Sequence, residues 1–118
     1  MARYVVMFPA DNEAEWEAGT DADHQQVYDT DEEFGRLLEK RGGVITGGRE
    51  LASTSRAHTI RRGPNGTALV TDGPYAESAE QLSGFYLITC DDEEGLLEAA
   101  QVLVRAHPAV EIRAVEES

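Results

Sequence analysis

Three stretches of the chain have the apolar pattern of β-strands. Residues 3–8 are β-branched and aromatic with apolar side chains on both faces, which predicts a central strand. Pro9 ends this strand because proline has no backbone donor. Residues 84–90 form a similar apolar run, whereas residues 110–115 alternate between apolar and polar, as a strand with one solvated face does. The pattern therefore predicts two well-buried strands and one half-exposed strand.

The segment 24–41 has helical spacing, because its apolar positions recur at steps of three and four. Two glycines directly after it end the helix. Two starting points of this helix are compatible with the sequence. A helix that includes His24 places His24 and Asp31 on the apolar stripe, whereas a start at Thr30 gives a capping box between Thr30 and Glu33.

Residues 91–107 predict a second helix. Four acidic residues stand at its N-terminal end, where the helix dipole is positive, and Arg105 and His107 stand at its negative end. Pro108 stops it. His107 is thus interpreted as a C-terminal cation of this helix.

Residues 57–62 and 67–71 predict a β-hairpin. The Gly-Pro-Asn-Gly sequence between them pre-sets a turn and tolerates positive φ. Residues 44–51 predict either a short strand or an extended passage, weakened by glycines of the kind that often mark close approach of the backbone to a neighbour.

The order of these elements is strand, helix, hairpin, strand, helix, strand. It predicts a single α+β domain over residues 1–118, ferredoxin-like, with a mainly antiparallel sheet and two helices on one face. The second face of such a sheet would be exposed to solvent unless another protein surface covered it. We therefore expect a homodimer.

The formal net charge of −13 argues against binding to nucleic acid or to an anionic membrane, because both need a basic face. No run of 18 apolar residues and no signal-peptide pattern occurs, so we expect a cytoplasmic protein. The single cysteine, Cys90, has no thiol partner and is expected to pack as a small hydrophobe.

The acids gather in the first third of the chain, with no Lys or Arg among them. A solvated surface that keeps the protein soluble is the favoured interpretation, and a docking surface for a basic partner is the alternative. The members of this cluster are Asp11, Glu13, Glu15, Glu17, Asp21, Asp23, Asp29, Asp31, Glu32 and Glu33.

Residues 70–86 are the stretch that a generic globular pattern does not explain. A strand stops at Asp72, Gly73 and Pro74, and acids and amides follow. Asp72 either bonds to the amides of the turn, in an Asx-type role, or acts as a partly buried functional carboxylate. Gly73 and Pro74 shape the corner in both interpretations.

The sequence Thr-Asp-Gly-Pro-Tyr-Ala-Glu at 71–77, with residues 80–88, resembles the DGPF-type branch of the YCII-related family. The resemblance extends to residues 42–51 and 110–113 and so accounts for nearly the whole chain as one YCII-related domain. Tyr75 stands where many members have Phe. The resemblance implies a ferredoxin-like fold of the dimeric α/β-barrel type, pairing through the sheets, with a cleft near the dimer interface.

The resemblance also implies chemistry. In the wider family a helix His and an Asp act as an acid/base pair, and one branch resembles a dehydrochlorinase of chlorinated hydroxyquinols. Here the position of the helix His falls on Asp31, and a solvated carboxylate with a pKa of about 3.9 is a poor proton donor at neutral pH. His24, two helical turns earlier, supplies an imidazole if the helix extends that far. Capping and solvation are the alternative roles of both residues.

The first hypothesis is a small-molecule cleft at the Asp-Gly-Pro-Tyr turn, with acid/base chemistry on a cyclic or aromatic substrate. Its proton-transfer groups are Asp72 and Asp31, assisted by His24 or by His58, for which a structural role is the alternative. Its ligand-binding residues are Gly73, Pro74, Tyr75, Glu77, Tyr86 and Arg62.

The second hypothesis is a non-catalytic regulator that acts with an extracytoplasmic-function sigma factor, since DGPF-type members are often encoded beside such factors. Whether the protein is an enzyme stays open between the two. No metal and no cofactor is expected, because no His-x-x-x-His pair and no phosphate-binding glycine loop occurs.

Overall fold

The computed structural model describes residues 2–9, 13–74 and 82–117. Its main layer is a four-stranded sheet in which every neighbouring pair is antiparallel, in the order β2-β5-β1-β6. The strands are β1 (Arg3–Pro9), β2 (Val44–Glu50), β5 (Leu82–Thr89) and β6 (Glu111–Ala114). This order, with the two helical crossovers, is consistent with the ferredoxin-like fold, and the α+β class predicted from the sequence is confirmed.

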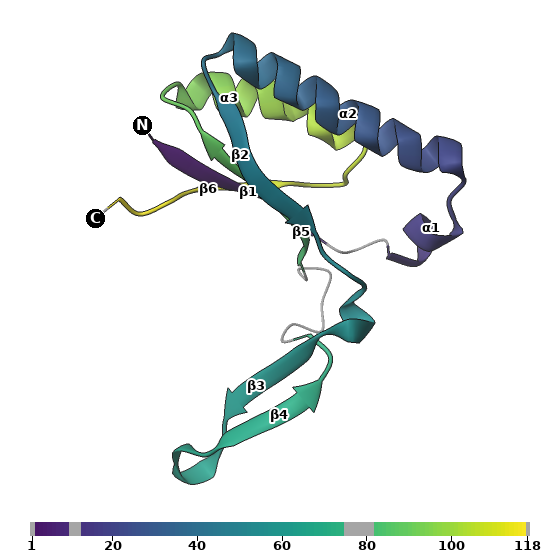
Figure 1. Cartoon of the computed structure of the whole chain (residues 1–118), viewed down its shortest axis with the longest axis vertical. Helices are drawn as coiled ribbons and strands as arrows, with labels where there is room; N and C mark the ends of the chain where they lie inside the picture. The colour runs from purple at the N-terminus through teal and green to yellow at the C-terminus, as the bar shows by residue number, and fades with distance from the viewer. Residues whose placement is uncertain (1, 10–12, 75–81, 118) are drawn as a thin grey trace.

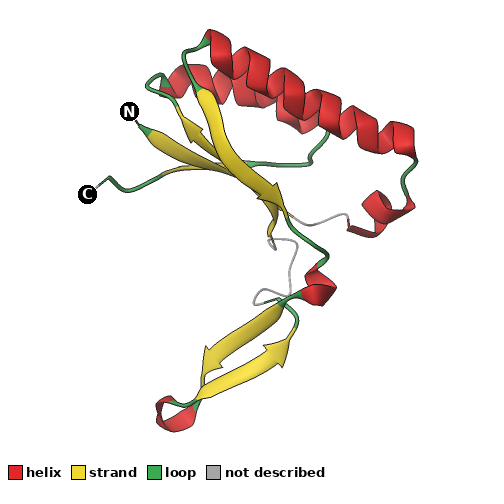
Figure 2. Ribbon diagram, in the orientation of Figure 1, coloured by secondary structure: helices red, strands yellow, loops and turns green. Residues whose placement is uncertain are grey.

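Helices cover one face of this sheet (Figures 1 and 2). None of the helices in the described residues lies on the other face (Figures 1 and 2). The covering helices are α2 (Asp21–Lys40) and α3 (Glu93–Ala100), while the short α1 (Glu13–Ala18) lies beside the start of α2.

The capping box of α2 is formed by Thr20 and Asp23. The Asp23 amide donates to Thr20 Oγ1 at 3.2 Å, and the Thr20 amide donates to Asp23 Oδ2 at 2.9 Å. The predicted start at Thr30 is therefore wrong, and the longer helix that includes His24 is correct. Thr30 lies in the helix interior, where its hydroxyl donates to the Gln26 carbonyl at 2.8 Å.

The second predicted helix is regular only in its first half. Asp92 caps α3 by accepting from the Gly95 amide at 2.9 Å, and the chain then tightens into the 3₁₀ helix η3 (Gln101–Arg105). This tightening ends the helical segment before Pro108 and turns His107 back toward α2.

The core lies between the helices and the sheet. In β1 alternate residues are buried, namely Tyr4, Val6 and Phe8, as a strand with one face on a core requires. They pack with a cluster of fully buried side chains: Phe34, Leu38, Ile88, Cys90, Leu96 and Leu103. Cys90 is 0% exposed, so its predicted role as a small core hydrophobe is confirmed.

Gly48 shows why β2 contains glycines. Its φ of +146° is rarely adopted by other residues, and a Cβ there would collide with the carbonyl oxygen of Phe85 on β5. The register of β2 against β5 also shifts between Ile45 and Gly47. The predicted close backbone approach is confirmed.

The predicted hairpin is a separate two-stranded sheet of β3 (His58–Arg62) and β4 (Ala68–Asp72). Its turn, η2 (Pro64–Gly66), uses left-handed φ at Asn65 (+63°) and Gly66 (+77°). The hairpin stands away from the sheet and helices (Figure 1).

Candidate functional site

A cleft of about 880 Å³ opens at the end of the sheet where β1 stops and α2 begins. Its walls come from α1, the first half of α2, the end of β2, the start of β5 and the segment after η3. Aromatic rings supply much of the apolar lining: Phe8, Trp16, Tyr28 and Tyr86. The volume lies within the range of roughly 300–1,000 Å³ typical of small-molecule sites.

Three polar side chains from separate elements meet in this cleft. Asp31 of α2 accepts from His107 Nε2 at 3.0 Å through Oδ1, and from the Tyr86 hydroxyl at 3.0 Å through Oδ2. The three residues are far apart in sequence and are brought together by the packing of α2 on β5 and by the turn after η3. We call them the Asp31 cluster.

Aromatic packing holds the Asp31 cluster in place. The Phe8 ring contacts His107 with centroids 4.4 Å apart and meets Tyr86 edge to face at 5.4 Å. Phe34, one turn after Asp31 on α2, stacks on Tyr86 from the core side at 6.4 Å. Side chains fixed by packing on rigid elements keep their polar atoms in defined positions.

Partial burial sets the electrostatics of the cluster. The side chains of His107 and Asp31 are 19% and 18% exposed, so water screens their interaction only in part. Burial of the phenol, and next the negative charge of Asp31, raise the pKa of Tyr86 far above its ordinary value. Tyr86 is therefore a neutral hydrogen-bond donor at any physiological pH.

The contact with Asp31 assigns the proton of the imidazole when the carboxylate is ionised. An ionised carboxylate only accepts hydrogen bonds, so His107 Nε2 must be the donor to Asp31. In the neutral ring Nδ1 is then the acceptor. The cluster thus combines an oriented imidazole base with a carboxylate that stabilises its protonated form.

Two residues predicted from the sequence, Asp31 and Tyr86, belong to this cluster. His24 lines the same cleft but serves the α1–α2 corner, where its ring stacks on Trp16 at 4.0 Å and its Nε2 lies 2.7 Å from the Trp16 carbonyl oxygen. It therefore supports the wall of the cleft next to the cluster.

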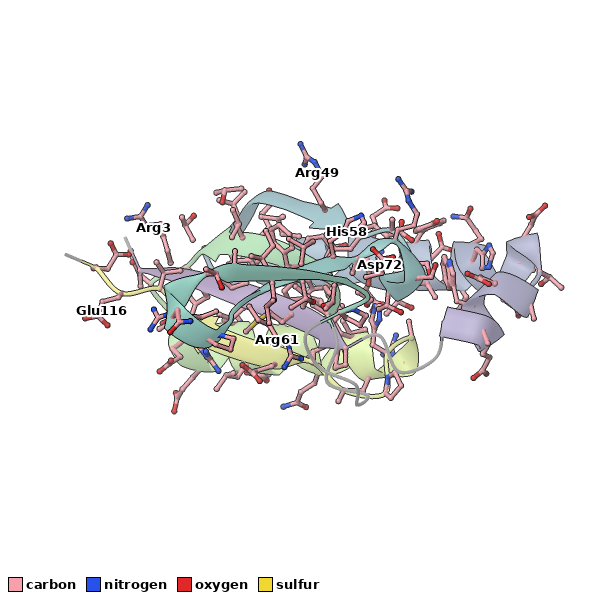
Figure 3. The ribbon with its side chains drawn as sticks, turned by 90° about the horizontal axis from the view of Figure 1, so that it is seen from below. Arg3, Arg49, His58, Arg61, Asp72 and Glu116 are labelled. Atoms are coloured by element: carbon pink, nitrogen blue, oxygen red, sulfur yellow. The ribbon has the colours of Figure 1, made fainter. Side chains whose placement is uncertain are left out.

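The other predicted site residues lie on the hairpin. His58 Nδ1 is 3.2 Å from Asp72 Oδ1 across the β3–β4 ladder, with the side chains 71% and 94% exposed (Figure 3). Gly73, with φ of +101°, shapes the corner after β4, and its carbonyl accepts from the Thr59 hydroxyl at 2.7 Å. These residues and the remaining ones on the hairpin, Pro74 and Arg62, do not line the cleft in the described part of the chain, and Tyr75 and Glu77 lie outside the described residues.

His107 was missed as a site residue. Its position at a helix end favoured the role of a cation on the helix dipole, and its actual partner, Asp31, lies 76 positions earlier in the chain. The histidine directly before Pro108, outside the regular helix, was the available signal.

Over residues 2–9, 13–74 and 82–117 no group of three or more His, Cys, Asp or Glu side chains is arranged to hold a metal ion. Within the same residues no helix is long and apolar enough to cross a membrane.

Comparison with known proteins gives two findings. A family model described as the YCII-related domain matches residues 2–118. A protein of Rhizobium meliloti (strain 1021), described as uncharacterized, is 44% identical over 59 residues, which make up 50% of this chain and 47% of that protein. The chain thus spans about half the length of this relative.

Proposed function

The chain belongs to the YCII-related family, and we propose that it binds a small cyclic or aromatic molecule and transfers a proton within the Asp31 cluster. The observation that carries the proposal is the Asp31 carboxylate, which accepts from both an imidazole and a phenol at 3.0 Å inside an aromatic cleft. Such a constellation is what general acid/base catalysis requires.

Each member of the cluster has a distinct role in this proposal. Asp31 holds His107 in the tautomer that leaves Nδ1 as the base, and its charge stabilises the imidazolium that forms when a substrate proton is taken up. Tyr86, kept neutral, donates to Asp31 in the empty cleft and is the group that donates to a substrate oxygen. A positioned base of this kind contributes roughly 10²–10⁴ in rate.

An imidazole and a carboxylate, the residue types of the family's acid/base pair, are then both present. The helix position that the resemblance assigns to a histidine holds Asp31, and the imidazole comes from His107 after η3. Asp31 need not be a proton donor itself in this arrangement, because His107 takes up and returns the proton.

The substrate class follows from the lining. Aromatic rings favour a planar apolar body, while Tyr86 and His107 favour a substrate with an oxygen next to an acidic C–H or O–H group. A hydroxylated ring has both features. We keep Asp72, Gly73, Pro74, Tyr75, Glu77 and Arg62 as a second proposed contact region, which requires the turn after β4 to close on the ligand.

We also propose that the protein is a homodimer whose two copies meet through the sheet face that the helices leave uncovered. The apolar side chains on that face support this proposal. They are Val5, Met7, Val44, Phe85 and Leu87. Val5 is paired with Leu87 and Met7 with Phe85, so the side chains of each pair lie on the same side of the sheet.

The experiment that tests the proton-transfer function measures how fast carbon-bound hydrogens of a substrate exchange with solvent deuterium. Hydroxylated aromatic compounds that raise the melting temperature are incubated with the protein in D₂O and followed by NMR. The wild type is expected to accelerate exchange, and His107→Gln, which keeps a polar side chain without a base, is expected to lose at least 100-fold of that rate. Equal rates for both proteins would refute the role of His107.

A non-catalytic regulator associated with a sigma factor is the second proposed function. The exposed acids of α2, including Asp29 and Glu32, support it, since they form a negative surface for a basic partner. Charge reversal of both residues is expected to abolish capture of the sigma factor and leave deuterium exchange unchanged. Undiminished capture would refute this electrostatic version.

A further inference from the structure

The β3–β4 hairpin, residues 58–72, has the properties of an arm that needs a partner. Its two strands pair only with each other in the described structure, whereas a two-stranded ribbon is at best marginally stable alone in water. Figure 1 shows it standing clear of the helices and of the four-stranded sheet. We therefore expect the hairpin to pack on another surface.

One face of the arm is apolar at its centre. The cross-strand pair Ile60 and Val70 is 70% and 67% exposed. The strand register places the His58–Asp72 pair at one end of this face and Arg62, opposite Ala68, at the other. We call these six residues the docking face.

The charge of the arm points to the rest of the same protein as its complement. Residues 58–72 contain Arg61 and Arg62 against the single acid Asp72, a formal charge of +1. Since the whole chain carries −13, the remaining residues carry −14. A basic arm is attracted to a second copy with so strong an opposite charge.

The second copy also offers the apolar surface. The open face of the sheet, on the side away from α2 and α3, carries Leu87 (41% exposed) between its strand neighbours Val5 and Gly47. The arm cannot lie on this face of its own sheet as the structure stands, because it extends away from it (Figures 1 and 2).

We propose that the arm of one copy lays its docking face on the open sheet face of a second copy, and that the second copy returns the same contact. This inference rests on the proposed homodimer and adds to it which surfaces meet. The arm leaves β2 through Leu51, Ala52 and Ser53, which line the cleft. Docking therefore also fixes one wall of the cleft, so the site is complete only in the dimer.

The test uses complementation between two variants. The arm variant, Ile60→Asp with Val70→Asp, keeps an intact sheet face, and the face variant, Leu87→Asp, keeps an intact arm. Leu97→Asp, at a position on α3 that is 48% exposed, is the matched control for adding a charge to an exposed leucine. Circular dichroism and melting curves verify that each variant is folded, and Leu87→Lys replaces the face variant if it is not.

Sedimentation velocity at a series of concentrations then measures self-association. The wild type and the Leu97→Asp control are expected to be dimers, and the arm and face variants alone are expected to dimerise about 100-fold more weakly. A mixture of arm and face variants is expected to form heterodimers, because one arm and one face remain intact in each such pair.

Three results would overturn the inference. If either the arm variant or the face variant dimerises as the wild type does, that surface does not take part in the interface, and the homodimer itself stands. If both are monomeric but do not complement each other, both surfaces are needed, with arms pairing with arms and faces with faces. If the wild type is a monomer at micromolar concentration, the homodimer fails as well, whereas the proton-transfer proposal is tested separately by deuterium exchange.

Discussion

Asp31→Asn is the most informative single change, because it removes the charge of the cluster and keeps its shape. An amide offers one oxygen as acceptor, whereas the carboxylate accepts from both His107 and Tyr86. Either one donor faces the amide NH₂ group, or His107 changes tautomer so that Nε2 accepts and Nδ1 carries the proton. The second outcome restores the hydrogen bond and removes the base.

The magnitude follows from the lost hydrogen bond. Leaving one partly buried donor unpaired, or losing the charge on the acceptor, costs about 1–3 kcal/mol. For a chain of this size we expect the melting temperature to fall by roughly 4–12 °C. Deuterium exchange of a bound substrate should fall by at least 100-fold, because the imidazole is no longer held as a base.

Thermal unfolding, deuterium exchange and ¹⁵N NMR of the imidazole measure these effects separately. The matched control is Asp29→Asn on the exposed side of the same helix, where the carboxylate accepts from Gln25 Nε2 at 2.9 Å. It removes the same charge from the acidic chain and should leave the melting temperature within about 2 °C of the wild type. If Asp31→Asn matches this control and His107 keeps its tautomer, the reasoning about the cluster is wrong.

Three further changes test other parts of the structure. Tyr86→Phe removes a group whose pKa is raised by burial and then by Asp31, so its contribution is fully present below about pH 10 and is lost as the pH rises toward the raised pKa. The variant should be less stable at neutral pH in chemical unfolding and show a smaller loss of stability above pH 10; an unchanged alkaline profile would contradict this. His24→Ala should alter the fluorescence of Trp16, from which it removes a ring stacked at 4.0 Å, and leave deuterium exchange within a few-fold; a loss as large as that of His107→Gln would give His24 a direct role. Gly48→Ala should cost about 1–3 kcal/mol or more, because it combines positive φ with a collision against β5, and a melting temperature equal to that of the wild type would refute the close approach.

Local patterns predicted the elements because each depends on a few neighbouring residues. The Pro-Asn-Gly turn sets the hairpin through its own φ values, and the alternation in β1 follows from one buried face. The start of α2 was ambiguous, since Thr30 with Glu33 forms a capping box in sequence while the helical spacing continues back to His24. Packing of His24 on Trp16 favours the longer helix, and no local pattern contains that contact.

The Asp31 cluster could be predicted only in part, for the same reason. Asp31 and Tyr86 each had a signal, the first from a family position and the second from its place after the polar stretch. His107 had none that outweighed its fit to the helix dipole, because its function depends on where the turn after η3 places it in space. The contact between His107 and Asp31, 76 positions apart, depends on the whole fold and is not contained in any local sequence pattern.

The two histidine–aspartate pairs differ more in their burial than in the distance between the imidazole nitrogen and the carboxylate oxygen. His107–Asp31 at 3.0 Å is about four-fifths buried, whereas His58–Asp72 at 3.2 Å is 71% and 94% exposed. An exposed pair contributes about 0–1 kcal/mol and is screened by water and salt, so it cannot orient a base as the buried pair does.

The His58–Asp72 pair on the hairpin could orient the imidazole in the same way only if another surface covered the pair and excluded water. Docking of the arm on a second copy supplies one, and His58→Gln should then weaken dimerisation if the pair is buried in the interface. An unchanged dimer in this variant, together with successful complementation between arm and face variants, would place His58 and Asp72 at the solvated rim of the contact.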